Sequence, residues 1–324
     1  MNTLLFRADG TTQTGLGHIM RCLALADMLG ETFERRFAIH NPSDAVLKLL
    51  AKQDVPVVAL QSGDVAELLT HVSATDVVVL DGYQFDEAFQ RAVRSKAHKL
   101  VFIDDLISGH QVADVVINHA GDVTAAEYQT EPYTTLLLGA NYALVNPAFV
   151  QKAQPKDGEN KAFVNMGGAD LHNVSHRVID LLLSINPDLR ITLALGAANP
   201  HFATFADFPK EQLGVQQNLS AKQMARAIGG SGLSVVAAST IAYEVASISR
   251  PMVIIQTVDN QNRMVSFMRD RHLVLGALTL PIDVDKLALA VKKARLTPSV
   301  FKQRIVFDGK VTDRYRQVFT QLCA

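Results

Sequence analysis

Residues 6–26 have the sequence Phe-Arg-Ala-Asp-Gly-Thr-Thr-Gln-Thr-Gly-Leu-Gly-His-Ile-Met-Arg-Cys-Leu-Ala-Leu-Ala. An apolar strand ends near Arg7, a polar loop with glycines follows, and an apolar helical run opens near His18. A strand that passes through such a loop into a helix begins a βαβ unit. The stretch therefore predicts a parallel sheet with a helix N-terminus at its carboxyl edge.

The alternation of short apolar runs and helical stretches continues through the first half of the chain. The expected strands are Leu4–Arg7, Arg36–Ile39, Val55–Leu60, Asp76–Leu80, Lys99–Ile103 and Val112–Ile117. The expected helices are Ile19–Leu29, Ser43–Lys52, Val65–Val72 and Asp86–Lys96. Continuous apolar strands separated by amphipathic helices are typical of a buried parallel sheet. Right-handed crossovers then place helices on both of its faces.

A polar segment with proline and glycine, residues 151–160, separates this half from a second run of the same kind. The strands expected there are Ala162–Met166, Arg190–Leu195, Gly214–Gln216, Gly232–Val236 and Pro251–Ile255. The expected helices are Val174–Ser184, Ala221–Ala227, Ile241–Ser249, Asn260–Arg271, Val284–Ala294 and Arg314–Cys323. We therefore expect an α/β protein with two Rossmann-like, doubly wound domains, residues 1–150 and 161–310. Residues 311–324 are expected to form a helix that packs back on the first domain.

Composition limits the classes of function. The chain of 324 residues is 48% hydrophobic and 19% charged, enough for two packed cores. Its net charge of −1, without a basic cluster, argues against binding to nucleic acid or to a membrane surface. No apolar run approaches the ~18 residues of a membrane helix, and the N-terminus does not resemble a signal peptide. The two cysteines fit a reducing compartment, so we expect a cytoplasmic protein.

The first loop carries groups that suit an anionic ligand and a proton transfer. Gly15 and Gly17 permit a sharp turn, and a helix N-terminus offers unpaired N–H groups. His18 stands where the helix begins and can act as a general base, although a capping histidine is the alternative. Arg21, one turn further on, can meet a phosphate or be a solvated side chain. Met20 stands where the dinucleotide-binding motif Gly-x-Gly-x-x-Gly has its third glycine, so binding of a nicotinamide dinucleotide is only weakly indicated.

The second half offers a similar set of groups. Gly167 and Gly168 follow a strand, where they permit either close approach of a ligand or simply a tight turn. Ser239 and Thr240 open a helix, so their hydroxyls can cap it or accompany a bound diphosphate. Glu244 lies on the same face as Thr240 and can accept hydrogen bonds from ribose hydroxyls, or be a solvated side chain.

The stretch from Phe6 to Asp9, together with Gln13 and the run from Gly15 to Arg21, resembles the opening of the PseG family of UDP-sugar hydrolases. The other matching blocks are Asp81-Gly-Tyr83, Ile103-Asp-Asp105, Tyr142-Ala-Leu144, Met166-Gly-Gly-Ala-Asp170, Ala238-Ser-Thr240 with Glu244, and Asp259-Asn-Gln261. This family hydrolyses UDP-2,4-diacetamido-2,4,6-trideoxy-β-L-altropyranose in pseudaminic acid biosynthesis. The resemblance implies two domains that face each other across a cleft, the glycosyltransferase-B architecture.

The resemblance also implies roles for individual residues. It assigns the chemistry to His18, Tyr83 and Asn260, and implies an inverting hydrolysis without a metal ion or other cofactor. The residues that it places against the UDP-amino sugar are Asp9, Gly15, Gly17, Arg21, Gly167, Gly168, Ser239, Thr240, Glu244 and Gln261. Asp104 and Asp105 are expected to orient loops. Two departures bear on the substrate: Ala237-Ala238 replaces a Gly-Gly pair, and Asn146 replaces a basic residue.

Three other functions remain open on the sequence. A glycosyltransferase of the same fold would use an acceptor hydroxyl in place of water. A protein that binds a nucleotide sugar without catalysis would hold UDP and turn nothing over. A 2-epimerase of similar fold would change the sugar while it stays attached to UDP. We expect a monomer whose partner is a small molecule.

Overall fold

The computed structural model describes residues 3–10, 16–150, 160–168, 170–196, 199–297 and 300–323. The chain divides into two compact units, residues 1–146 with 310–324, and residues 147–309. The first unit ends four residues before the expected boundary at 150. The reason is the short helix η4 (Pro147–Phe149), which packs against α6 (Ala221–Gly229) and α7 (Thr240–Ser247) of the second unit.

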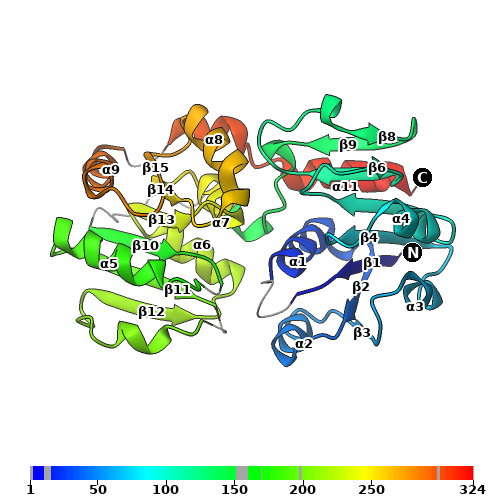
Figure 1. Cartoon of the computed structure of the whole chain (residues 1–324), viewed down its shortest axis with the longest axis horizontal. Coiled ribbons are helices and arrows are strands. Elements are labelled where there is room, and N and C mark those ends of the chain that lie inside the picture. Colours follow the sequence, from blue (N-terminus) through cyan, green and yellow to red (C-terminus); the bar gives the residue numbers. More distant parts are fainter. Residues whose placement is uncertain are drawn as a thin grey trace. The chain divides into compact units, whose positions relative to one another are not determined.

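Seven strands of the described first unit form one parallel sheet in the order β3-β2-β1-β4-β5-β7-β9 (Figure 1). These strands are β1 (Thr3–Ala8), β2 (Glu34–His40), β3 (Val57–Leu60), β4 (Asp76–Asp81), β5 (Lys99–Ile103), β7 (Val115–Asn118) and β9 (Thr135–Leu138). The β3-β2-β1-β4-β5 order is that of a doubly wound fold, in which ligands bind beyond the carboxyl ends of the strands.

The register of this sheet brings three loops to one edge. Ala8 at the end of β1 pairs with Asp81 at the end of β4, and Asp81 pairs with Ile103 at the end of β5. Every residue of β4 is buried, as a central parallel strand requires. The segments that follow these three strands therefore emerge side by side, and the helix after β1 starts at the same edge.

Four helices follow strands of the first unit: α1 (Gly17–Leu29), α2 (Asp44–Ala51), α3 (Val65–Thr70) and α4 (Glu87–Arg94). Side chains cap two of them, because Ser43 accepts from the Val46 N–H and Asp86 from the Phe89 N–H. α1 begins at Gly17 without a side-chain cap. Its first N–H groups therefore need another partner.

The described second unit has a six-stranded parallel sheet in the order β12-β11-β10-β13-β14-β15. Its strands are β10 (Lys161–Asn165), β11 (Arg190–Leu195), β12 (Leu213–Gln217), β13 (Leu233–Ala237), β14 (Met252–Ile255) and β15 (Gly276–Leu278). Besides α6 and α7, its helices are α5 (Val174–Ile185), α8 (Asn262–Asp270), α9 (Val284–Leu296) and α10 (Phe301–Val306). The sequence therefore predicted the fold class correctly, as two Rossmann-like sheets.

The expected elements differ from the structure where side chains replace backbone partners. The strand expected from Val112 begins only at Val115. Gln90 and Tyr133 bind the N–H and C=O of Val112, and Thr134 binds the C=O of Ala113. The helix expected to reach Ser249 ends at Ser247, since Ser249 has a left-handed φ of 62°.

The elements that the sequence did not predict are all short. The strands β6 (His110–Gln111) and β8 (Gln129–Thr130) form a separate parallel pair, and β9, β15 and α10 were also missed. Runs of two to six residues show no clear periodicity. Within the part of the chain that the structure describes, no helix is long and apolar enough to cross a membrane.

The last helix, α11 (Val311–Leu322), belongs to the first unit, where Figure 1 shows it in red. It packs against α1, and the buried ring of Phe319 meets Phe33 edge to face. The Tyr315 hydroxyl donates to the C=O of Tyr142 at 2.6 Å. Arg316 donates to the C=O of Met28 at the end of α1.

The Phe319 contact predicts how far α11 stabilises the first unit. Phe319→Ala should lower the free energy of unfolding by ~3–5 kcal/mol, because it leaves a cavity between α11 and α1. Gln317→Ala on the exposed face of the same helix should change it by less than ~0.5 kcal/mol. Urea unfolding of both variants measures the difference, and equal losses would show that α11 does not stabilise the unit through its apolar face.

Candidate active site

His18 lies in the first turn of α1, at the edge where β1, β4 and β5 end. Its Nδ1 is 2.7 Å from Oδ1 of Asp81, the last residue of β4. A carboxylate only accepts hydrogen bonds, so Nδ1 carries the hydrogen. The Nε2 atom, which has no partner among the described residues, is then the unprotonated nitrogen that can accept a proton.

Arg21, one turn further along α1, holds the same carboxylate. Its Nε donates to Asp81 Oδ2 at 2.6 Å, and its Nη2 donates to Asp81 Oδ1 at 2.5 Å. Its Nη1 reaches both oxygens of Asp105, at 2.8 and 2.7 Å. The 3.1 Å approach of Arg21 Nη2 to His18 Nδ1 brings two donors together and is therefore no hydrogen bond. Arg21 links the ends of two strands to α1 and is fully engaged.

Burial and pairing act against each other on Asp81, whose side chain is 0% exposed. Burial raises the pKa of this carboxyl, but the charge and hydrogen bonds of Arg21 and His18 outweigh it, so the pKa is below its usual range. For Arg21, burial lowers the pKa, whereas Asp81 and Asp105 raise it above the ordinary value. Both groups are therefore charged at neutral pH.

Cys22 completes the surroundings of Asp81. Its Sγ donates to Asp81 Oδ2 at 3.6 Å. Burial raises the pKa of the Cys22 thiol, and Asp81 raises it further, so it stays protonated. Asp81 thus accepts four hydrogen bonds from three side chains, which fixes both of its oxygens and, through Oδ1, the plane of the His18 ring.

Tyr83 stands beside His18 on the loop after β4. The two rings meet edge to face with centroids 5.0 Å apart, and the Tyr83 side chain is 61% exposed. The pKa of Tyr83 is raised, chiefly by burial of part of the ring and by Asp105. Its hydroxyl has no partner among the described residues, so it is a neutral donor available to a ligand.

A buried histidine, His119, lies in the surroundings of the Arg21–Asp105 pair. Its Nδ1 accepts from the Leu144 N–H at 3.0 Å. Burial lowers the pKa of His119 to about 4, and the charge of Arg21 adds to this effect. His119 is therefore neutral and adds no charge to the site.

The other candidates of the first loop have different surroundings. Asp9 forms an ion pair with Arg7, accepts from the backbone N–H of His40 at 2.9 Å and accepts from Gln84 at 3.0 Å. These contacts anchor the start of the loop. Gly17 is the first residue of α1, where an added Cβ would meet nothing within 4 Å. Gly15 lies outside the described residues.

Three glycines shape the loops at the carboxyl edge of the second sheet. Gly167 has a φ of 91°, a conformation that favours glycine, and its N–H donates to Asn165 Oδ1. A Cβ at Gly196, after β11, would lie 2.4 Å from the C=O oxygen of Gly168. Gly196 therefore allows the two loops to touch. Sequence reasoning missed it because this role needs a neighbour that is distant in sequence.

Ser239, Thr240 and Glu244 lie on α7 or directly before it. Ser239 is the N-cap residue, yet its side chain makes no capping hydrogen bond. Glu244 is half-buried on the next turn and has no partner among the described residues. Burial raises the pKa of Glu244 to about 8. An unpaired carboxyl beside a helix N-terminus is a place where a ligand with hydroxyl donors can bind.

The residues expected near the sugar in the second unit lie in the short helix η6 (Asp259–Gln261). Asn260 is exposed there and has no partner among the described residues. Gln261 turns back on its own loop, because its Oε1 accepts from the Thr257 N–H at 2.8 Å. The structure thus brings His18, Arg21 and Tyr83 together in the first unit. It places Gly167, Gly168, Ser239, Thr240, Glu244, Asn260 and Gln261 in the second unit.

The two departures from the PseG pattern have clear surroundings. Ala237 and Ala238 are 2% and 1% exposed at the end of β13, so their methyl groups fill the core. Asn146 donates to Asp27 at 2.7 Å. No group of three metal-ligating side chains occurs among the described residues.

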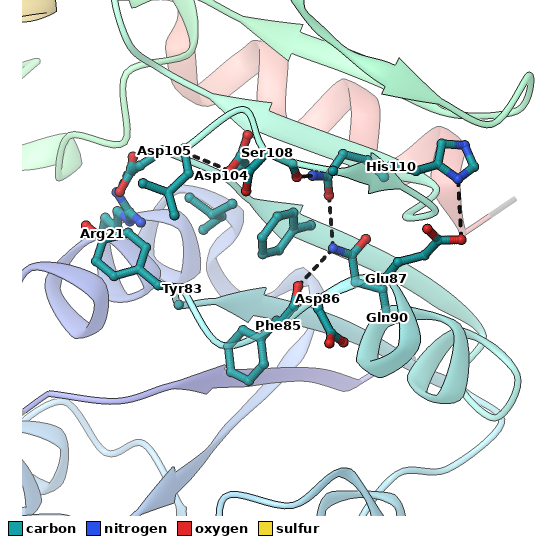
Figure 2. Close-up of a pocket in the computed structure, with 16 residues that line it drawn as sticks. Arg21, Tyr83, Phe85, Asp86, Glu87, Gln90, Asp104, Asp105, Ser108 and His110 are labelled. Carbon is teal, nitrogen blue, oxygen red and sulfur yellow. Dashed lines mark hydrogen bonds and ion pairs between the residues drawn. The ribbon is translucent and has the colours of Figure 1, made fainter.

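A pocket of about 290 Å³ opens beside this site within the first unit. Figure 2 shows Arg21, Tyr83 and Asp105 at one end and Glu87 and His110 at the other. The loop after β4 and the start of α4 form one wall. The segment from the end of β5 to β6 forms the other.

Asp81 is the functional residue whose role the sequence did not reveal. The motif Asp81-Gly-Tyr83 was noticed for its tyrosine, while Asp81 itself ends a wholly buried strand. An acidic residue at the end of such a strand needs a cationic or hydrogen-bonding partner. The sequence shows an aspartate at the end of an apolar strand, and this indicates that Asp81 needs such a partner. It does not reveal that the partners are Arg21 and His18, 60 and 63 positions earlier in the chain.

The burial of Asp81 predicts a difference between two aspartates that both bind Arg21. Asp81→Asn should cost ~3–5 kcal/mol of stability at pH 7, because it leaves a buried guanidinium with half of its charge balance. Asp105→Asn should cost ~1 kcal/mol or less, since the Asp105 side chain is 28% exposed. Urea unfolding of the two variants checks this, and equal costs would contradict the central role of Asp81.

The same pair predicts the direction of a pH effect. Because the pKa of Asp81 is lowered on folding, its contribution to stability is complete above ~3.9, the ordinary value. It is lost as the pH falls through the lower folded value. The stability difference between wild type and Asp81→Asn should therefore shrink only in acid. A difference that shrank between pH 6 and 8 would point to another group.

The chain has sequence relatives among known proteins. No family model matches the chain. It is 23% identical over 272 residues to the UDP-2,4-diacetamido-2,4,6-trideoxy-beta-L-altropyranose hydrolase of Campylobacter jejuni, covering 82% of this chain and 95% of that protein. It is 22% identical to the spore coat polysaccharide biosynthesis protein SpsG of Bacillus subtilis, covering 83% and 81%. An uncharacterised Methanocaldococcus jannaschii protein is 28% identical over 200 residues, which are 58% of this chain and 41% of that protein.

Solved structures share the fold at low sequence identity. MurG of Acinetobacter baumannii has a TM-score of 0.63 at 13% identity, with 99% of this chain and 100% of that chain covered. The calicheamicin glycosyltransferase CalG4 has a TM-score of 0.67 at 10% identity, covering 99% and 98%. HepE of Anabaena, solved with UDP and glucose, has a TM-score of 0.62 at 13% identity, covering 99% of each chain. The chain therefore has the fold of the glycosyltransferase-B enzymes and is a sequence relative of the Campylobacter UDP-sugar hydrolase.

Proposed function

We propose that this protein hydrolyses a UDP-linked 2,4-diacetamido-2,4,6-trideoxy sugar to the free sugar and UDP. The observation that carries the proposal is the His18–Asp81 pair, with Nδ1 2.7 Å from a buried carboxylate and Nε2 free among the described residues. A histidine held in this way can accept a proton from water at Nε2 and so act as a general base. The sequence relationship to the Campylobacter hydrolase supports the substrate class.

The proposed step is a direct displacement by water. The water oxygen forms a bond to the anomeric carbon while one of its protons passes to His18 Nε2. The bond between that carbon and the diphosphate oxygen breaks, and UDP leaves with the electron pair. Attack opposite the leaving group inverts the anomeric configuration. Asp81 stabilises the imidazolium that forms, as a carboxylate behind a catalytic histidine does.

We assign UDP mainly to the second unit. The N-terminus of α7 with Ser239 and Thr240 offers N–H and hydroxyl donors to the diphosphate. Glu244 would accept hydrogen bonds from the ribose hydroxyls, and the loop at Gly167 and Gly168 permits close approach of the nucleotide. HepE, which shares the fold, was solved with UDP and glucose, and this supports UDP as part of the ligand.

The remaining candidates take supporting roles in the proposal. Tyr83 and Asn260 would bind the sugar or the attacking water, and Gln261 would hold the loop that carries Asn260. Arg21 was expected to meet a phosphate, but its contacts with Asp81 and Asp105 make it a positioning residue. Asp9 would anchor the first loop, and Gly15 and Gly17 would let the diphosphate approach α1. The described cysteines, Cys22 and Cys323, are unpaired, which is consistent with a cytoplasmic setting.

The role of His18 predicts a selective loss of turnover. His18→Asn should lower kcat by ~10²–10⁴-fold, because the proton acceptor is gone, and leave the Kd for UDP within about twofold. The exposed His98, at the opposite end of the sheet before β5, gives a control in His98→Asn with unchanged kcat. The assay follows UDP release from the UDP-diacetamido sugar. Near-normal turnover by His18→Asn would contradict the proposal.

The raised pKa of Glu244 predicts that a proton is released when UDP binds. With a pKa of about 8 the free carboxyl is mostly protonated at pH 7, and ribose hydroxyls that donate to it favour the ionised form. UDP binding at pH 7 should release close to one proton per UDP in the wild type and none in Glu244→Gln. Calorimetry in buffers of different ionisation enthalpy measures this number. A wild type that released no proton would remove Glu244 from the ribose site.

A glycosyltransferase is the second candidate, because structures such as MurG and CalG4 share the fold. It would use an acceptor hydroxyl where we place water. Incubation with the UDP-sugar and no acceptor separates the two: many turnovers to free sugar support the hydrolase. UDP release that depends on an added acceptor supports the transferase. Tight binding without turnover would indicate a binding protein, and an epimerised UDP-sugar would indicate an epimerase.

A further inference from the structure

The pocket beside the catalytic residues has two walls that the chain locks together. Gln90, 1% exposed, donates to Gln111 Oε1 at 2.9 Å and to the C=O of Phe85 at 3.1 Å. Gln111, 2% exposed, donates in turn to the C=O of Ser108 at 2.8 Å. These buried amides tie the start of α4 to the loop before β6. The pocket between the two walls is therefore preformed.

One end of the pocket joins the candidate active site. Tyr83 and Arg21 line both, and Arg21 is held by Asp105 on the opposite wall (Figure 2). A ligand whose reacting carbon lies near His18 can thus extend a substituent into the pocket. Its volume of about 290 Å³ is enough for a monosaccharide or part of one.

The charges that line the pocket exclude the diphosphate end of the substrate. Four carboxylates face or border it: Asp86, Glu87, Asp104 and Asp105. Asp81 and Asp105 already balance the charge of Arg21, while His110 lies beside Glu87 at 3.5 Å. The surplus of negative charge repels a diphosphate. The occupant must therefore be the neutral, sugar end of the molecule.

The lining also offers the three kinds of contact that an N-acyl group needs. An N-acyl group has an N–H donor, a C=O acceptor and a methyl group. The Asp105 carboxylate can accept the N–H, while Ser108 Oγ, which has no partner among the described residues, can donate to the C=O. Leu106, 55% exposed, and the rings of Phe85 and Phe102 offer apolar surface to the methyl group.

We propose that this pocket, between residues 82–90 and 102–111, binds an N-acylamino substituent of the sugar and selects for it. The inference rests on the proposed function and deepens it, because it names the part of the substrate that the first unit recognises. Its tests use Ser108, whose side chain is exposed on the loop that forms one wall and has no partner among the described residues; the hydrogen bond from Gln111 goes to its backbone C=O, which a substitution keeps.

The turnover experiment compares three variants. Ser108→Phe should fill the pocket and raise KM for the UDP-diacetamido sugar by about tenfold or more, with the Kd for UDP unchanged. Ser108→Ala, which removes only the hydroxyl, should raise KM by a smaller factor. Ser95→Phe, an exposed serine at the far end of α4, should match the wild type. A KM for Ser108→Phe within twofold of wild type would overturn the inference.

A binding experiment separates this inference from the proposed hydrolysis. Saturation-transfer NMR with the UDP-diacetamido sugar on His18→Asn protein should show strong transfer to an acetyl methyl and to the uridine. Adding Ser108→Phe should abolish the acetyl signal and keep the uridine signal. If the wild type shows no turnover but the acetyl signal is lost in Ser108→Phe, the proposed hydrolysis is wrong and the proposed binding of the N-acyl group in the pocket is supported. If the wild type shows turnover but Ser108→Phe does not change the acetyl signal, only the proposed binding of the N-acyl group in the pocket is contradicted.

Discussion

A single buried carboxylate, that of Asp81, organises the first unit's site. It ends a strand without exposed residues and accepts hydrogen bonds from His18, Arg21 and Cys22. A buried charge of this kind is tolerated only when it is paired and its lone pairs are satisfied. Asp81 meets that condition by binding α1, and Arg21 extends the connection to Asp105 after β5. The physical requirement to satisfy Asp81 is thus what orients the His18 ring.

The hydrogen bonds of this site divide Arg21 from His18. Arg21 has committed each of its donor nitrogens to Asp81 or Asp105, so little of its charge remains for a ligand. His18 has one nitrogen against the carboxylate and one without a partner among the described residues. Glu244 in the second unit contrasts with Asp81: it is half-buried and has no partner among the described residues, and its pKa rises to about 8 instead of falling. The fold supplies hydrogen-bond partners to Asp81, and the proposed function assigns a ligand to Glu244.

The sequence was sufficient for the fold because the signal was repeated. Apolar strands such as Asp76–Asp81 alternate with amphipathic helices in both halves, and the structure has a parallel sheet in each. Contacts between segments that are far apart in the chain could not be predicted from the sequence. The strand expected from Val112 starts later because Gln90, Tyr133 and Thr134 bind its backbone. The pairing of His18 with Asp81 and the contact of Gly196 with Gly168 depend on the folded sheet in the same way. His18 and Tyr83 were named from local motifs, whereas the residue that positions His18 was not.

The tautomer of His18 is decisive, because a proton can pass from water to Nε2 only if the hydrogen of the neutral ring is on Nδ1, against Asp81. Nitrogen-15 NMR of histidine-labelled protein at pH 8, assigned by comparison with His18→Asn, reports which ring nitrogen carries the hydrogen. From the contact with Asp81 we expect a protonated Nδ1 and an unprotonated Nε2 for His18, with that preference lost in Asp81→Asn. An Nε2–H tautomer in the wild type would contradict it, since His18 could then accept no proton from water at that atom.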